Sequence, residues 1–253
     1  MTWAPAISDS PSHAPRWRQT SILMVIGLAL AGVGLTLEAD RYVYDLDLYV
    51  YNLAHDVFNH NTRPVPDHFK PLKRIFSSVE VWGENIFVLL VAFAIWRLDR
   101  HRRSRVVFLA LSAIVVALGV EGVKRVTGRE RPEVSQGKTV IHGWHKFTAG
   151  GDYQSFPSGH TAAAASYGGS LSAFYPPLRP AMIALTVGCG GSRIWKERHF
   201  FSDCLFGGLI GFLAAYLLPR AGAARRFAEW FDRRFSVPYP RDASPTRTSL
   251  RAA

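Results

Sequence analysis

The chain has little cysteine: its 253 residues include only two, Cys189 and Cys204. Both lie in apolar stretches, where cysteine usually packs as a small apolar side chain. Neither has the neighbours that mark a thiolate nucleophile or a zinc ligand, so the sequence excludes chemistry of these two kinds. A disulfide between them is allowed but not favoured.

Acidic residues are also scarce: there are 19 of them and 30 basic residues, and the formal net charge is +11. On a soluble protein this surplus would indicate nucleic-acid binding. Here the basic residues flank apolar segments, as at Arg16 and Arg18, at 97–105 and at 220–234. Anionic lipid head groups attract cations in such positions. We therefore expect the lipid bilayer, and no nucleic acid, as the partner of these charges.

The mean hydropathy of +0.05 is low for a membrane protein. Polar segments at both ends, at 40–78 and at 125–157 lower the average, while the apolar runs between them remain distinct. The first run is followed by Glu38 and Asp40 without a clear cleavage site, so we expect a retained span and not a signal peptide. The sequence predicts an all-α bundle of six transmembrane helices. The six runs are Ser21 to Leu37, Val81 to Leu98, Val106 to Val123, Thr161 to Tyr175, Ala181 to Ile194 and Cys204 to Leu218.

The basic stretch 97–105, between the second and third runs, is typical of a cytoplasmic loop. Alternation of the spans then places an N-terminal segment, 1–20, and a basic tail, 220–253, on the cytoplasmic side. The membrane domain is predicted to occupy 21–219. Its polar clusters, which lie within 124–203, fall on the opposite, outer side.

Two further segments are amphipathic. Leu46 to Phe58 has apolar residues at helical spacing, which predicts a helix that either lies in the outer interface or covers the bundle as part of a loop. In the tail, aromatic residues fall on one side among arginines, which predicts an anchor at the inner membrane surface. These aromatic residues are Phe227, Trp230, Phe231 and Phe235.

A phosphate pocket is predicted where the fourth run begins. Ser158 can cap a helix there, and Gly159 lets the main chain approach a ligand. Free N–H groups and the helix dipole favour an anion at such a start. His160 is then placed beside that anion. The same residues also make ordinary turns and caps, so this cluster alone does not establish a site.

Fixed cations come from the end of the third run. Lys124 ends that run, and Arg131 follows seven residues later with Pro132 stiffening the loop. Cations at helix ends often only extend to the membrane interface, and that reading fits Lys124, Arg125, Arg129 and Arg131 equally well. The other two clusters favour a phosphate-binding role for Lys124 and Arg131.

The third cluster contains Arg193, His199 and Asp203. Because His199 and Asp203 are four residues apart, a helix would place Asp203 to accept a hydrogen bond from one imidazole nitrogen and leave the other free to attack. Each residue singly also fits a capping or interface role. All of them together on one membrane face favour a catalytic site.

Lys124 with Arg131-Pro132, Pro157 to His160, and Ser192-Arg193 with His199 and Asp203 resemble the three-part signature of type 2 phosphatidic acid phosphatases. The resemblance covers roughly a third of the chain. It implies a six-helix membrane phosphatase in which His199 forms a phosphohistidine, Asp203 orients it and His160 protonates the leaving oxygen. It also implies that no metal or cofactor is needed, since cations and amides stabilise the charge. The implied phosphate-binding residues are Lys124, Arg131, Ser158, Gly159 and Arg193.

Two histidines, His142 and His145, lie between the first two motifs without a carboxylate at ligand spacing, so no metal site is expected there. We expect Trp144, His145, Lys146 and Tyr153 of this loop to shape the substrate entrance.

The sequence thus predicts a bacterial inner-membrane phosphatase that acts on the outer leaflet. The substrate would be a phospholipid, a polyprenyl pyrophosphate or lipid A, and the oligomeric state is left open. A vanadate-dependent haloperoxidase uses a similar cage, but the resemblance implies soluble enzymes in that family. A transporter or scaffold that only binds phosphate lipids is disfavoured by the complete nucleophile and carboxylate pair.

Overall fold

A computed structural model describes residues 42–58, 70–146 and 150–238, and all regular structure in these ranges is helical apart from one isolated bridge between Arg129 and Ile141. The predicted span Ser21 to Leu37 lies outside the described residues. The longer helices are α2 (Tyr42–Phe58), α3 (Lys70–Glu80), α4 (Asn85–Leu98), α5 (Ser104–Thr127), α7 (Gly159–Phe174), α8 (Arg179–Trp195), α9 (Phe201–Leu217) and α10 (Gly222–Phe235). The short elements are α6 (Pro132–Ser135), η2 (Val81–Gly83), η3 (Gly143–Lys146), η4 (Gly151–Tyr153), η5 (Pro176–Leu178) and η6 (Leu218–Arg220).

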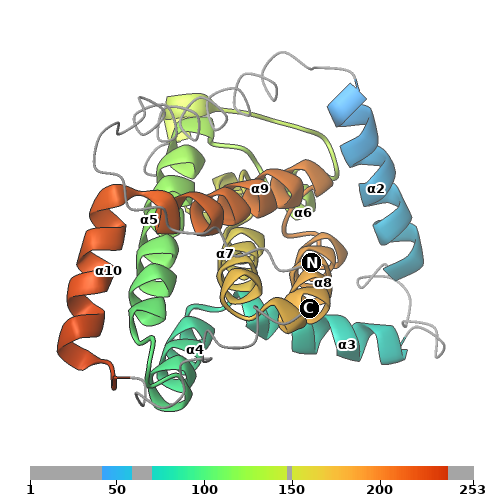
Figure 1. The fold of residues 1–253 in the computed structure, drawn as a ribbon. Coiled ribbons are helices and arrows are strands. Elements are labelled where there is room, and N and C mark those ends of the chain that lie inside the picture. Colours follow the sequence, from blue (N-terminus) through green and yellow to red (C-terminus); the bar gives the residue numbers. More distant parts are fainter. Residues whose placement is uncertain (1–41, 59–69, 147–149, 239–253) are drawn as a thin grey trace, which may run out of the picture.

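Helix α7 is the centre of the bundle, with α5, α8 and α9 packed around it (Figure 1). Small residues allow this close approach. A β-carbon on Gly207 of α9 would lie 2.4 Å from the carbonyl oxygen of Ser158, and one on Gly211 would lie 2.1 Å from that of Ala162. Because neither main-chain oxygen can move independently of its helix, only glycine fits at these two positions.

Two described helices have the length and composition of membrane spans, Ser104–Thr127 and Phe201–Arg220. A bent pair, Arg74–Gly83 with Ile86–Leu98, adds a third if it counts as one span. The third and sixth predicted runs are therefore found as apolar helices. The other described runs are helical but shorter than a standard span of about 20 residues, and the total of six stays a prediction.

The predicted span Val81 to Leu98 is divided in the structure. The chain passes from α3 through η2 and bends by 69° before it continues as α4. The bend packs tightly against the bundle, since Trp82 and Gly83 are buried and a β-carbon on Gly83 would lie 2.7 Å from the carbonyl oxygen of His160. Gly83, Glu84 and Asn85 interrupt the apolar run at this point, a signal that the prediction of one straight span did not use.

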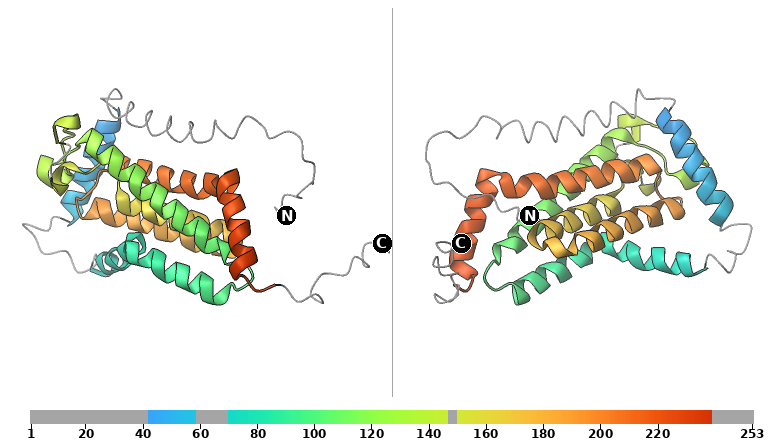
Figure 2. Two further views of the ribbon diagram at one scale, coloured as in Figure 1. Left: turned by 90° about the vertical axis from the view of Figure 1, so that its left-hand side faces the viewer. Right: turned by 45° about the vertical axis from the view of Figure 1, so that its right-hand side comes forward.

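Helices α2 and α10 lie at opposite ends of the bundle (Figure 2). Helix α10 packs on α5, where Asp232 accepts hydrogen bonds from the N–H and hydroxyl groups of Ser104 at 2.7 and 2.6 Å. Helix α2 contacts α8 and α9 through a side that buries Asp47 and Ala54. Its side chains Leu46 and Leu53, which predicted an apolar face, are exposed. The helix therefore both covers the bundle and presents an apolar surface.

The two cysteines are free and buried, as small core residues. Cys189 packs in the main apolar cluster with Trp82, Tyr167 and Met182. This confirms the packing role expected for Cys189 and Cys204.

Candidate functional site

The start of α7 meets the start of α9 and the end of α5. Ser158 caps α7, as predicted, because its hydroxyl oxygen accepts a hydrogen bond from the N–H of Thr161 at 3.4 Å. The N–H of Ser158 donates to the carbonyl oxygen of Asp203 at 2.9 Å, which joins the second motif to the third. A β-carbon on Gly159 would lie 3.5 Å from Nζ of Lys124, so the ammonium of the first motif reaches the same turn. We call this end of the bundle the site end.

His199 lies in the connection between α8 and α9 with 2% of its surface exposed. Its Nδ1 lies 2.7 Å from the carbonyl oxygen of Ser155. A carbonyl oxygen can only accept, so Nδ1 carries the proton of the neutral ring and Nε2 keeps its lone pair. The nearest approach to Asp203 is 3.7 Å, from Nδ1 to Oδ2. The hydrogen bond that the sequence assigned to Asp203 is thus made to Ser155, and Asp203 acts at slightly longer range.

Asp203 is fully buried and is held by three groups. Arg129 approaches Oδ1 at 2.6 Å, while Oδ2 accepts from the hydroxyl of Ser155 at 2.5 Å and from the N–H of Phe200 at 2.9 Å. Ser155 therefore contacts the imidazole with its carbonyl oxygen and the carboxylate with its hydroxyl. The carboxylate is fixed in one orientation beside His199.

Arg129 makes several contacts that hold the site together, a role that was not predicted from the sequence. Only 1% of it is exposed, and besides Asp203 it binds Asp47 of α2 at 2.8 Å and the hydroxyl of Thr139 at 2.9 Å. Its guanidinium also lies 4.1 Å from the ring centre of Phe200. Burial works to lower the pKa of Arg129, but Asp203 and Asp47 outweigh it and raise the pKa, so the group stays charged.

Asp47 completes this network from the other side. Its carboxylate also accepts hydrogen bonds from the N–H of Ser202 at 2.8 Å and from the hydroxyl of Ser202 at 2.6 Å. Helix α2 is thereby attached to the first turn of α9, where Asp203 lies. No spacing rule links Asp47 to Arg129, because 82 residues separate them.

Two cations, Arg131 of the first motif and Arg193 of the third, act electrostatically on His199. Burial lowers the pKa of His199 to about 4, and the positive charges of Arg131 and Arg193 act in the same direction while Asp203 opposes them. Arg131 is anchored through Nε to the carbonyl oxygen of Gly151 at 2.7 Å. Burial lowers its own pKa, as do the charges of Arg198 and Arg193. An anion between these groups would relieve the repulsion.

Two acidic residues, Glu80 and Glu84, lie on either side of the α3 to α4 bend and meet the predicted site. Glu80 pairs with Arg193 and with Lys196. Glu84 approaches Nε2 of His160 at 3.0 Å. Neither was predicted from the sequence, because Glu84 lies inside, and Glu80 directly before, an apolar run taken as one straight span.

The loop between the first two motifs has a polar contact of its own. Nε2 of His142 lies 2.7 Å from Glu130, and the ring lies 5.3 Å from that of Tyr153. Trp144 is exposed, and the side chains of His145 and Lys146 lie outside the described part of the chain. Within that part, no three His, Cys, Asp or Glu side chains gather as metal ligands.

The fold and site define a helical membrane-type bundle with a buried histidine, a fixed carboxylate and converging cations at one end. Residues 105–227 match the family model of the PAP2 superfamily. The match confirms the resemblance inferred from the three motifs.

Two curated relatives are similar to part of the chain. A lipid A 1-phosphatase of Rhizobium etli is 28% identical over 110 residues, which cover 42% of this chain and 47% of that protein. A lipid A 1-phosphatase of Rhizobium johnstonii is 26% identical over 125 residues, which cover 48% and 51%. The chain therefore spans about half the length of the curated relatives it matches.

Solved structures share the fold. The LpxE of Aquifex aeolicus matches with a TM-score of 0.50 at 20% identity, covering 66% of this chain and 92% of that one. A transmembrane PAP2 type phosphatidylglycerolphosphate phosphatase from Bacillus subtilis matches with a TM-score of 0.50 at 20% identity, covering 84% and 96%. The likeness establishes the fold and leaves the substrate to be argued from the site.

Proposed function

We propose that this protein removes phosphate from a membrane lipid by metal-independent transfer to His199. The observation that carries the proposal is the tautomer of His199: Nδ1 is bound to the Ser155 carbonyl oxygen, so the Nε2 lone pair is available for attack. Asp203, which lies 3.7 Å from Nδ1, stabilises the positive charge that the ring acquires in the transition state.

The reaction has two steps. In the first, Nε2 of His199 forms a bond to phosphorus as the bond to the lipid oxygen breaks, and His160 gives the leaving oxygen its proton. In the second, the oxygen of water attacks phosphorus while His160 takes a proton from that water; the nitrogen–phosphorus bond breaks, inorganic phosphate leaves and His160 is protonated again. Glu84, at 3.0 Å from Nε2 of His160, is placed to orient that acid.

Phosphate binding falls to the groups around the start of α7. The proposal assigns the phosphate oxygens to Lys124, Arg131, Arg193 and the capped turn at Ser158 and Gly159. Nε of Arg193 is buried and has no hydrogen-bond partner among the described residues, so it is a donor still available to a ligand. Such fixed cations stabilise the charge of the transferring phosphoryl group without a metal.

The substrate is proposed to be a lipid phosphate of the lipid A type, since both curated relatives carry the name lipid A 1-phosphatase. Phospholipid phosphates and polyprenyl pyrophosphates are the other members of the same chemical class. We further propose that the site end faces the outer side of a bacterial inner membrane, because the basic loop at 97–105 lies at the opposite end of α5.

The test is release of inorganic phosphate by the purified protein in detergent with a chelator present. The substrates are lipid A, phosphatidic acid, phosphatidylglycerol phosphate and undecaprenyl pyrophosphate. His199→Asn should reduce release by at least roughly a thousandfold. His142→Asn, a histidine of the neighbouring loop, is the matched control and should retain release. Release that requires a metal, or that survives in His199→Asn, would refute the proposal, and vanadate-dependent halide oxidation would move the assignment to a haloperoxidase.

A further inference from the structure

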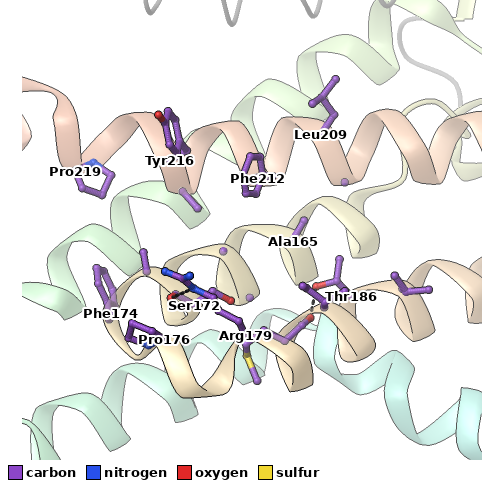
Figure 3. Close-up of a pocket in the computed structure, with 18 of the residues that line it drawn as sticks. Ala165, Ser172, Phe174, Pro176, Arg179, Thr186, Leu209, Phe212, Tyr216 and Pro219 are labelled. Carbon is purple, nitrogen blue, oxygen red and sulfur yellow. Dashed lines mark hydrogen bonds between the residues drawn. The ribbon is translucent and has the colours of Figure 1, made fainter. Parts of the chain in front are cut away.

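An open groove lies between α8 and α9, with α7 as its floor (Figure 3). Its volume is about 920 Å³, which is within the range of pockets that hold small molecules. Small residues of α7, such as Ala165 and Gly168, line the floor and leave space between α8 and α9. Leu209, Phe212 and Tyr216 of α9 form one wall.

The walls of the groove are formed largely by apolar side chains that are exposed at the surface of the described part of the chain. On α8, Ile183 and Val187 are 63% and 69% exposed, and Phe212 opposite them on α9 is 53% exposed. In a membrane these side chains meet hydrocarbon, so the groove is suited to a lipid chain lying along the helices.

One end of the groove is charged. Among the described residues that line it there are two arginines, Arg179 and Arg220, and no acidic residue. The guanidinium of Arg179 is turned inward, where Nε donates to the carbonyl oxygen of Ser172 at 3.2 Å (Figure 3). That of Arg220 lies 3.6 Å from the ring centre of Tyr216. The lining therefore offers a net positive charge at one end and hydrocarbon elsewhere.

The charged end is remote from the site end. Arg179 begins α8, whereas the connection that holds His199 follows the end of this 17-residue helix. At 1.5 Å per residue the helix is about 25 Å long. A head group at Arg179 therefore belongs to a different lipid from one whose phosphate lies at His199.

We propose that this groove binds a second lipid, a phospholipid with an anionic head group, with one acyl chain between α8 and α9 and the head group at Arg179 and Arg220. A small soluble anion would leave the apolar walls without a partner, and a zwitterionic lipid would bring no net negative charge to the end that carries the two arginines. The site is separate from the phosphate-transfer chemistry and does not depend on it.

The test counts bound lipid by native mass spectrometry after the purified protein is reconstituted with phosphatidylglycerol or phosphatidylcholine. The wild type should retain one phosphatidylglycerol in preference to phosphatidylcholine. Arg179→Gln with Arg220→Gln should weaken phosphatidylglycerol binding by about tenfold or more. The matched control, Arg225→Gln with Arg226→Gln, removes the same charge from neighbouring α10 and should keep the preference.

Three results would overturn the proposal. Equal loss in both double variants would mean general attraction to a basic surface. Unchanged binding in the groove variant would mean that the arginines hold no head group. A higher KM for phosphate release in the groove variant, with phosphatidylglycerol binding intact, would assign the groove to the substrate's own chains. Ala173→Leu, which narrows the groove without altering charge, should also reduce bound phosphatidylglycerol while phosphate release continues.

Discussion

Replacing Arg129 with methionine should destabilise the protein more than any other single change at a cation of this region. Arg129 is 1% exposed and lies 2.6 Å from Asp203 and 2.8 Å from Asp47, both of which are equally buried. Methionine fills much of the volume but leaves two carboxylates without their cation. Removing one partner of a buried ion pair costs about 3–5 kcal/mol, and here two pairs are broken at once.

The assay is the free energy of unfolding in detergent, measured with a denaturant series on both proteins. Arg125→Met, one turn earlier, is the matched control: Arg125 pairs with Glu121 at 2.6 Å, but its side chain is 39% exposed. An exposed pair of this kind contributes about 0–1 kcal/mol. If Arg129→Met unfolds at the same denaturant concentration as Arg125→Met, the network does not stabilise the site as argued.

Three further predictions concern the same end of the bundle. Burial lowers the pKa of His199 to about 4 from an ordinary value of about 6.5, so as the pH falls between these values the unfolded chain gains a proton before the folded protein does. The free energy of unfolding of the wild type should therefore decrease across that window, and His199→Gln should flatten this pH dependence when unfolding is measured at several pH values. Gly207→Ala should destabilise by about 1–3 kcal/mol, since its β-carbon would lie 2.4 Å from the main-chain oxygen of Ser158. Gly208→Ala, whose β-carbon would lie 3.8 Å from the side chain of Thr161, should be tolerated in the same unfolding assay. Ser155→Ala removes the hydroxyl that donates to Asp203 but keeps the carbonyl oxygen that binds His199, and it should lower the unfolding free energy by about 1.5–3 kcal/mol.

Local signals in the sequence predicted the parts of the site that depend on neighbouring residues. A serine before a glycine and an apolar helix is enough to predict the cap at Ser158, and the structure has it. The apolar runs at 106–123 and 204–218 likewise predicted the helices that the structure has at 104–127 and 201–220. The roles assigned to the motif residues stay predictions, although the structure brings the three motifs to one end of the bundle.

The remaining features depend on contacts across long stretches of sequence. Arg129 meets Asp203 across 74 residues, and it looked like one more interface cation because the acidic residues near it in the chain, Glu130 and Glu133, are not the carboxylates that it binds. The bend at Gly83 packs against α7, but Gly83, Glu84 and Asn85 also interrupt the apolar run there, so the sequence held a local signal for it. The error at Arg129, in contrast, arises where tertiary contacts determine the role of a residue.

The contacts of His199 explain why so much buried charge surrounds it. The imidazole is oriented by a main-chain oxygen of Ser155, and the hydroxyl of the same residue holds Asp203. Neither contact can shift without the other, so the position of the nucleophile depends on the loop before α7 and on the first turn of α9 together. Asp47 binds that turn from α2. A helix with an exposed apolar face is thereby connected through Arg129 to the carboxylate beside the nucleophile, and displacing α2 would leave two buried charges unpaired. We therefore expect α2 to be as necessary to the site as the three motifs themselves.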